Sequence, residues 1–194
     1  MLRRLAPIRL NLKMNKFEII KTIFDEAKII KNYARTDNRG FMTVFFDNGE
    51  MAGLGIDFTV RENRTYEMPE EGTFFGIHYQ TADHPGAKLV SLIKGKGMDY
   101  VIDLRPESST YLKWEATELS SENGLAAYIP TGFGHAFISL SDDVIMLYQT
   151  DFHGGKGVTG RLNYKESAIG LKLPLEIIHI ADYDSDAPYL REGI

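Results

Sequence analysis

Residues 74–104 read FFGIHYQTADHPGAKLVSLIKGKGMDYVIDL, and this stretch decides the fold class. It contains three short runs rich in β-branched and aromatic residues: Phe74 to Gln80, Lys88 to Lys94 and Met98 to Leu104. Turn sequences, Pro85-Gly86 and Gly95-Lys96-Gly97, separate the runs. Runs of this length between glycine and proline turns are typical of strands. The stretch therefore predicts three successive β-strands.

The same pattern continues on both sides of this stretch. Further short apolar runs, again bounded by turn residues, are Met42 to Phe46, Leu125 to Ile129, Ala136 to Leu140 and Val144 to Phe152. Many short strands at such spacing predict an all-β sandwich or barrel. No long helical periodicity occupies the middle of the chain, which argues against a doubly wound α/β fold.

One segment near the start fits two structures. Phe17, Ile20, Phe24, Ala27 and Ile30 could form one face of a helix. The same residues also include two β-branched pairs around a possible turn at positions 25–26. We expect two strands here.

The length of 194 residues and the hydrophobic content of 43% suit one domain with a substantial core. We expect this domain over residues 14–194, with residues 1–13 as a loose basic arm and the polar residues 182–194 as a second arm. No apolar run is long enough to span a membrane.

Charge and cysteine content narrow the classes of function. The net charge of −5 gives no reason to expect binding to nucleic acid or to an anionic membrane. The absence of cysteine excludes disulfides, thiolate metal sites and a cysteine nucleophile. The chain needs no oxidising compartment, and we expect a cytoplasmic protein.

Several sequence blocks, taken in order, resemble the dTDP-4-dehydrorhamnose 3,5-epimerase family. They run from about residue 17 to the C-terminal end: Asp37 to Phe41, Gly76 to Gln80, Ala87 to Val90, Asp103 to Arg105, Leu119 to Asn123, Ile129 to Phe137, Leu147-Tyr148, and Ile169 to Leu171 before Pro174. The resemblance implies an all-β, cupin-type jelly-roll sandwich. It also implies a homodimer in which one subunit helps to complete the partner's site.

The resemblance further implies a cofactor-free and metal-free epimerase that acts on a 4-keto-6-deoxy sugar nucleotide. Such an enzyme removes a proton beside a ketone and returns it on the opposite face, which requires a base, an acid and a charge that stabilises the enolate. By resemblance, His78 is the base, Lys88 neutralises the enolate, Tyr148 is the opposite donor and Glu166 orients His78. Each also has an ordinary alternative: a structural histidine, a surface lysine, a core tyrosine or a solvated acid.

The resemblance also carries substrate-binding positions. His135 lies in a Pro-Thr-Gly-Phe-Gly-His loop that would line the site beside the sugar and the diphosphate. Arg39 matches an arginine that contacts the nucleotide, although a plain turn arginine is the alternative. Gln80 follows the base, and Arg61 and Asn63 belong to a segment similar to the family's substrate-contacting strand.

The sequence departs from the family pattern mainly on the side that holds the nucleotide. Phe75 replaces the arginine that grips the diphosphate, and Met42 and Val44 replace an aromatic residue and a glutamate. Glu166 stands where the family has an aspartate. A different nucleotide, a different sugar or inversion of a single carbon would all fit these changes.

Three other functions remain compatible with this scaffold. A metal-dependent cupin would need converging histidines, but the five histidines include no His-x-His pair, although His84 and His153 could add ligands. A catalytically silent sugar-binding cupin fits the altered phosphate contacts. A sugar-nucleotide ketoisomerase would use a similar base.

The loss of arginine at position 75 yields a first prediction. Arg61 and Arg64 could take over the anionic contact. If Arg61 does so, Arg61→Ala is expected to raise the KM for a nucleotide sugar, because a charge-assisted hydrogen bond is lost. Initial-rate kinetics measure this, and an unchanged KM would exclude Arg61 from the site.

Overall fold

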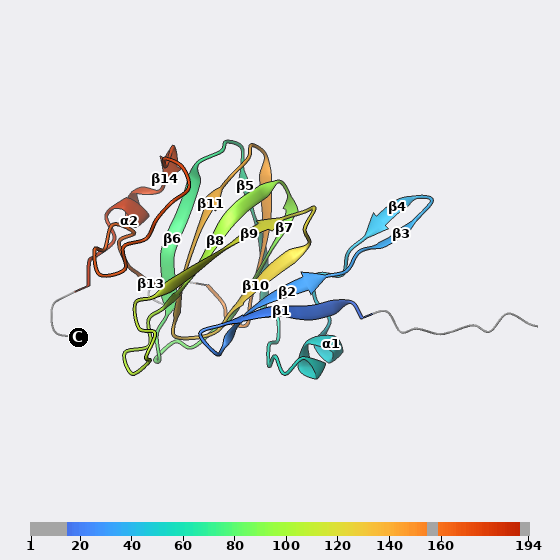
Figure 1. Cartoon of the computed structure of the whole chain (residues 1–194), viewed down its shortest axis with the longest axis horizontal. Helices are drawn as coiled ribbons and strands as arrows, with labels where there is room; N and C mark the ends of the chain where they lie inside the picture. The colour runs from blue at the N-terminus through green and yellow to red at the C-terminus, as the bar shows by residue number, and fades with distance from the viewer. Residues whose placement is uncertain (1–14, 155–158, 191–194) are drawn as a thin grey trace, which may run out of the picture.

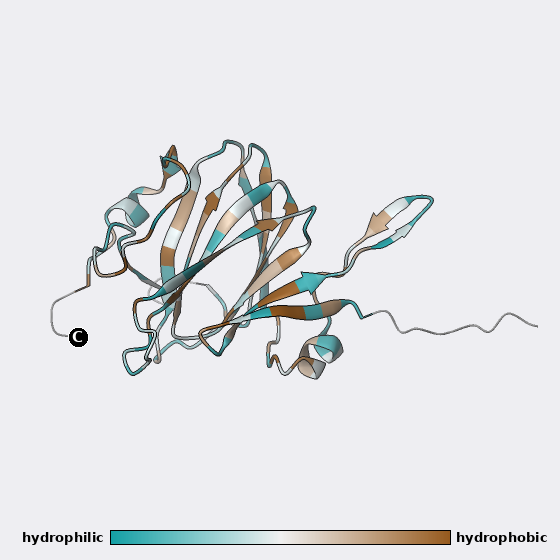
Figure 2. Ribbon diagram, in the orientation of Figure 1, coloured by the Kyte–Doolittle hydropathy of each residue, from teal (hydrophilic) through white to brown (hydrophobic). Residues whose placement is uncertain are grey.

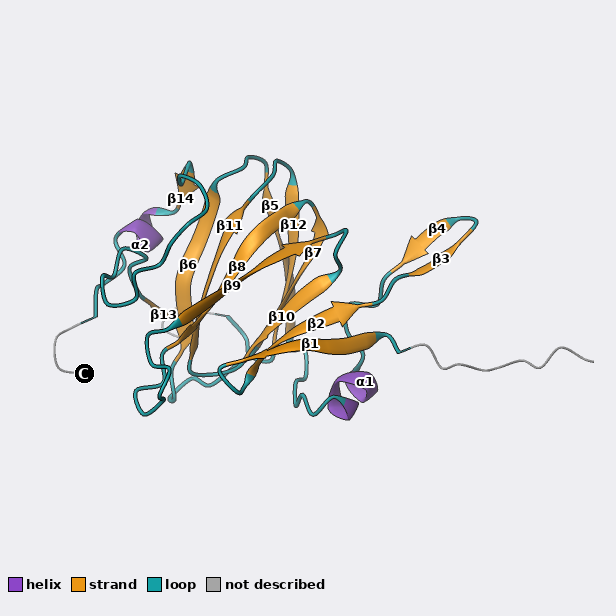
Figure 3. Ribbon diagram, viewed as in Figure 1, coloured by secondary structure: helices purple, strands orange, loops and turns teal. Residues whose placement is uncertain are grey.

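The computed structural model describes residues 15–154 and 159–190. The arm predicted over residues 1–13 lies outside the described residues. Strands make up most of the regular secondary structure, and the two short helices of the described residues lie at the periphery (Figure 3). This arrangement confirms the all-β prediction.

Two six-stranded sheets face each other as a sandwich (Figure 1). The first sheet has the order β1 (Phe17–Ile23), β2 (Ala27–Asn32), β10 (Leu125–Ile129), β7 (Lys88–Lys94), β12 (Val144–Thr150) and β5 (Glu62–Met68). The second has the order β13 (Thr159–Arg161), β6 (Thr73–Gln80), β11 (Phe133–Ser139), β8 (Lys96–Asp103) and β9 (Trp114–Ser120), with β14 (His179–Ile180) pairing in parallel with β6. The other pairs are antiparallel, as in a jelly roll.

The main core fills the space between the two sheets. Alternate residues of each strand point inward, so β12 contributes Val144 and Met146 while β7 contributes Val90 and Leu92. Apolar residues lie along the strands of both sheets, interrupted by polar positions (Figure 2). Burial of this apolar face is the main force that holds the sheets together.

Irregular segments cover the outer face of each sheet. The first sheet is covered by α1 (Asn48–Gly53) and its flanking residues, which bury Met51, Ile56 and Phe58. The second is covered by the C-terminal segment, which includes α2 (Asp182–Ser185) and buries Leu162 and Ile169. The expectation of a polar C-terminal arm is therefore wrong for residues 182–190, because α2 lies against β6 and Asp184 is buried.

Most of the predicted runs form strands, but the sequence pattern did not identify β5 or β9, and one predicted run is wrong in part. The ambiguous N-terminal segment forms two strands, β1 and β2, as expected. The strand expected from Met42 to Phe46 is wrong beyond β4 (Gly40–Met42). Val44 and Phe46 are apolar because they pack on the outer apolar cluster, where Phe46 meets Phe58 edge to face at 5.7 Å. Burial alone does not require a strand.

A small hairpin, β3 (Arg35–Asp37) with β4, projects away from the sandwich (Figure 1). Its tip carries Arg39, and its second strand carries Phe41 and Met42, which are 78% and 54% exposed. Large apolar side chains at such exposure are unusual on a surface that faces only water.

An irregularity in β6 shapes the interior. His135 pairs with His78, whereas Phe137 pairs with Phe75, so β6 has one extra residue between the two pairs. Gly76 occupies this bulge at φ +114°, and a Cβ there would lie 2.6 Å from the carbonyl oxygen of His135. The extra residue lets Phe75 and His78, three positions apart, face the same cavity.

A buried carboxylate fixes the loop that follows β8. Asp103 is fully buried and accepts hydrogen bonds from Arg105, Ser108 and Thr110 at 2.5 to 3.0 Å. Arg105 also bonds the carbonyl of Phe24 and pairs with Glu26 in the β1–β2 turn. Burial opposes ionisation, but these donors outweigh it and hold the pKa of Asp103 well below its usual range.

The Asp103 contacts predict a pH-dependent loss of stability. Because the folded pKa of Asp103 is depressed, its contribution is present above the unfolded pKa of about 3.9 and is lost as pH falls below it. Asp103→Asn is expected to lower the free energy of unfolding at pH 7 by about 3 kcal/mol. Urea unfolding from pH 7 to pH 3 should show this difference shrinking as the pH falls.

Asp143→Asn provides the matched control. Asp143 forms an exposed pair with Lys94, and such pairs contribute at most about 1 kcal/mol. Equal losses in the two variants would contradict a special role for Asp103.

Candidate active site

Eight side chains from the two sheets and α2 line a cavity of about 50 Å³ at one side of the sandwich: Tyr66, Phe75, His78, His135, Phe137, Met146, Tyr148 and Tyr183. Three predicted site residues, His78, His135 and Tyr148, are therefore brought together. Pockets that enclose small ligands usually measure about 300–1,000 Å³. This cavity is smaller than that range, and Tyr183, 52% exposed, is the most exposed of the eight side chains.

His78 is held by a buried aspartate. Its Nε2 lies 2.6 Å from Asp184 Oδ1, and Asp184 is 1% exposed. A carboxylate accepts, so the imidazole donates through Nε2 and keeps the lone pair on Nδ1. The other oxygen of Asp184 accepts from the backbone N–H of Gly76, at the bulge of β6. The Asp184 carboxylate therefore fixes the orientation of a histidine that can accept a proton.

The prediction that Glu166 orients His78 is wrong. Glu166 accepts hydrogen bonds from the backbone N–H groups of Ala168 and Leu190, at 3.0 and 2.8 Å, and so fastens the C-terminal segment. Asp184 has the predicted role instead. The sequence missed it because Asp184 stands among other acids in a polar segment, where burial has no periodic signal. The one available hint was the return to apolar residues just after it, at Ala187 and Pro188.

Lys88 lies beside His78 inside the sandwich. Its Nζ donates to the carbonyl oxygen of His78 at 2.9 Å, and the residue is 2% exposed. Burial lowers the pKa of Lys88 to about 7, although the negative charge of Asp99 opposes the shift. A lysine in this state exchanges its proton near neutral pH, and an arriving negative charge would favour its ammonium form.

A second histidine–aspartate pair lies deeper in the same region. His135 Nε2 is 2.7 Å from Asp99 Oδ2, and both residues are buried. The ring of His135 lies 5.9 Å from the ring of Tyr148. The sequence did not single out Asp99, although an acid at an inward position of an apolar strand is a recognisable signal.

Tyr148 stays protonated at neutral pH. Burial raises its pKa strongly and the neighbouring Tyr66 adds to this, while the positive charge of Arg64 opposes it. Arg64 faces Tyr148 across the β5–β12 pair, with its Cζ 5.9 Å from the Tyr148 ring. A phenol in this setting can donate a proton, and the nearby cation offsets part of the cost of the resulting phenolate.

Lys88 and the remaining predicted residues are not among the side chains that line this cavity. Arg39, 85% exposed, pairs with Asp37 on the projecting hairpin. Arg61 is exposed, and Asn63 accepts from Gln149 on the opposite face of β5 from Tyr148. Gln80 is buried and donates to Thr159 at 2.9 Å.

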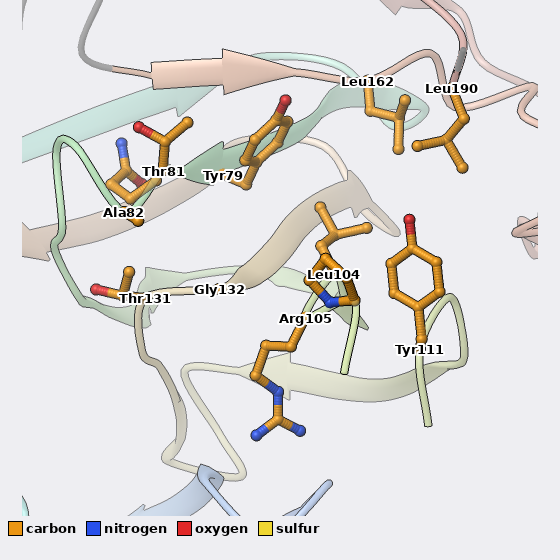
Figure 4. A pocket seen from close by; sticks show the side chains of 12 residues that line it. Tyr79, Thr81, Ala82, Leu104, Arg105, Tyr111, Thr131, Gly132, Leu162 and Leu190 are labelled. Atoms are coloured by element: carbon orange, nitrogen blue, oxygen red, sulfur yellow. The ribbon is translucent and has the colours of Figure 1, made fainter. Parts of the chain in front are cut away.

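A larger cavity of about 350 Å³ lies on the outer side of the second sheet. Figure 4 shows Tyr79, Leu104, Tyr111 and Leu162 around it. It contains none of His78, Lys88, His135 or Tyr148. Its lining is mostly apolar, so the titratable groups favour the smaller cavity as the site of chemistry.

No helix within residues 15–154 and 159–190 is long and apolar enough to cross a membrane. Across the same residues, no group of three or more histidine and acidic side chains is arranged to hold a metal ion. His78 and His135 are each bonded to a separate aspartate.

Comparison with known proteins agrees with the resemblance seen in the sequence blocks. A model of the dTDP-4-dehydrorhamnose 3,5-epimerase family matches residues 21–192. The epimerase of that name from Methanothermobacter thermautotrophicus is 35% identical over 93% of this chain and 98% of its own length. A dTDP-4-dehydro-6-deoxyglucose 3-epimerase from Streptomyces bikiniensis is 30% identical over 80% of each chain. The Bacillus anthracis 3,5-epimerase structure, with TDP and pyrophosphate bound, has a TM-score of 0.86 and 26% identity, covering 90% of this chain and 99% of that one.

The burial of Lys88 predicts an unusual gain in stability on its removal. Because the folded pKa is lowered to about 7, wild-type stability rises with pH from about 7 towards the unfolded value of about 10.4. Lys88→Met removes the buried charge and is expected to raise the free energy of unfolding at pH 7 by up to about 3 kcal/mol. Urea unfolding of both proteins at pH 7 and pH 9.5 tests this, with a smaller difference expected at pH 9.5.

Lys94→Met, on the exposed end of the same strand, is the control. It should change stability little at either pH. A variant at position 88 that is less stable than the wild type at pH 7 would show that Lys88 stabilises the fold.

Proposed function

Because this chain belongs to the dTDP-4-dehydrorhamnose 3,5-epimerase family, we propose that it epimerises a 4-keto-6-deoxy sugar nucleotide through an enolate. The observation that carries the proposal is the convergence of His78, held by Asp184, with Tyr148 on one cavity. Base and acid on opposite sides of a bound ring are what inversion beside a ketone requires.

In this reaction His78 takes the proton from the carbon next to the ketone, and the C–H electron pair moves into the enolate. Lys88, whose Nζ bonds the backbone carbonyl oxygen of His78, would supply the positive charge that stabilises the enolate. Tyr148 then gives its phenolic proton to the opposite face of the same carbon. The phenolate and the imidazolium return to their starting forms by proton exchange with water, so no cofactor is consumed.

Family relatives include both 3,5-epimerases and 3-epimerases. One base and one acid are enough for either outcome, because the sugar can present C3 and C5 in turn. The number of inverted carbons is therefore a question of how the ring is held, which the departures at Phe75 and Met42 affect.

We also propose that the functional unit is a homodimer in the cytoplasm. Support comes from the projecting β3–β4 hairpin, whose Phe41 and Met42 are apolar and exposed. A partner subunit would bury them and would bring Arg39 towards a nucleotide. Nucleotide-sugar chemistry and a chain without cysteine suit the cytoplasm.

The direct test is incubation with dTDP-4-keto-6-deoxyglucose in heavy water, followed by NMR of C3 and C5. Deuterium at one or both carbons is expected. No exchange with this or other keto-sugar nucleotides would favour a sugar-binding cupin, and a displaced ketone would identify a ketoisomerase.

Two variants locate the base in the same assay. Asp184→Asn is expected to slow the exchange at least about 100-fold, because the amide no longer fixes the imidazole or stabilises its charge. Glu166→Gln keeps an oxygen that can accept a backbone N–H and leaves Asp184 in place, so it should slow the exchange far less. The opposite ranking would restore Glu166 as the partner of His78.

A further inference from the structure

A sugar-nucleotide substrate carries a negative charge, which a group near the cavity has to bind. A sugar nucleotide carries its diphosphate on C1, directly beside the ring that His78 and Tyr148 would hold. Phe75, at the position of the family's diphosphate-binding arginine, cannot bind it. Its ring instead packs against Tyr66 at 5.2 Å, edge to face. A cation from another strand has to take this role.

Most cations near the cavity are engaged or lie elsewhere. Lys88 is buried and bonded to the backbone of His78. Arg39 is paired on the hairpin. Arg161 lies over the ring of Tyr183 at 5.4 Å and donates to the Tyr183 carbonyl. Arg61 is exposed, and strand alternation directs it away from the Tyr148 face of β5.

Arg64 meets the requirement. It lies directly opposite Tyr148 in the β5–β12 register and faces the same side. Its Nη1 is 3.4 Å from the hydroxyl of Tyr66, a residue that lines the cavity together with Phe75. The guanidinium therefore lies beside Tyr66 and Tyr148, two of the side chains that line the cavity.

The contacts of Arg64 leave part of its hydrogen-bonding capacity unused. Its Nη2 lies 2.6 Å from Glu62 Oε1 in an ion pair whose two side chains are about one-third exposed. Its Nε and Nη2 are both buried, and neither makes a hydrogen bond among the described residues. A buried guanidinium N–H without a partner is costly, which is an incentive to bind an anion.

The neighbouring loop packs closely on Arg64. A Cβ on Gly154 would lie 2.6 Å from Arg64 Nη2, so a larger residue at this position would have to displace the guanidinium. The same glycine donates its N–H to the other carboxylate oxygen of Glu62 at 2.8 Å. Glu62 thus holds both the guanidinium and the loop in the absence of ligand.

We propose that Arg64 binds the diphosphate of the substrate, and that Glu62 is the anion with which the diphosphate competes. This inference rests on the proposed function and names the residue that replaces the arginine lost at position 75. It makes Arg64 a binding residue that places the sugar between His78 and Tyr148. Two phosphate oxygens match the fork of a guanidinium, which an amide or a single ammonium does not reproduce.

Calorimetric titration with dTDP, which lacks the sugar, tests the inference apart from catalysis. Arg64→Gln is expected to weaken binding about 10-fold or more, and Arg64→Lys to lie between it and the wild type. Glu62→Gln should tighten binding, because a competing carboxylate is removed. Lys94→Gln is the control. It also removes one positive charge, at a position about 20 Å along β7 from Lys88, and its dTDP affinity should stay within about twofold of the wild type.

A rescue variant guards against a folding artefact. Phe75→Arg in the Arg64→Gln background restores an arginine at the original position and is expected to recover part of the dTDP affinity. Far-ultraviolet circular dichroism would verify that each variant is folded. A folded Arg64→Gln variant with wild-type affinity would overturn the inference, and so would a larger loss in Arg61→Gln.

The failure of the two proposals can be told apart. If the wild type exchanges deuterium but Arg64→Gln binds dTDP normally, only the assignment of Arg64 fails. If the wild type binds dTDP through Arg64 but exchanges no deuterium, the epimerase proposal fails and a nucleotide-sugar binder remains. No dTDP binding by the wild type would overturn the diphosphate assignment.

Discussion

The bond between His78 and Asp184 joins two parts of the chain that are more than one hundred residues apart. The histidine belongs to β6, and the aspartate to α2 in the C-terminal segment. The carboxylate is 1% exposed and holds the imidazole with one oxygen and the bulged backbone at Gly76 with the other. A buried carboxylate without these partners would be strongly unfavourable. The imidazole of His78 is therefore held in position only when the C-terminal segment is packed on the second sheet.

The interior of the sandwich is divided between two kinds of packing. The greater part is apolar and supplies the stability that lets the sheets enclose polar groups. The rest contains four polar groups whose burial costs free energy: Lys88, Asp99, His135 and Tyr148. The lowered pKa of Lys88 and the raised pKa of Tyr148 have the same main cause, the removal of water. The fold is thus less stable than it would be with apolar residues at these positions, but it holds groups that can react.

Much of the fold could be predicted from the sequence because its determinants are local. Turn residues and short β-branched runs located most strands, and the blocks around His78, His135 and Tyr148 brought these three residues to one cavity. Asp184 could not be located in this way, because its burial depends on a segment that packs over the second sheet. Arg61 and Arg64 could not be separated either, since only the register of β5 against β12 shows which of them faces Tyr148. Val44 and Phe46 led to a wrong strand prediction for a similar reason. Apolar residues in a buried irregular segment have the same local sequence pattern as a strand.

The place of Tyr183, immediately before Asp184, restricts how the cavity can open. Its ring stacks near His78 at 6.2 Å. If α2 swung outward as a unit to let a ligand pass, it would carry the carboxylate away and leave the imidazole unsupported. Opening by rotation of the tyrosine side chain alone leaves that carboxylate in place. Rotamer changes of exposed side chains take picoseconds to nanoseconds, far less than helix or domain movements. Such a gate would be too fast to limit turnover, so the slow step would lie in the chemistry or in the release of the nucleotide.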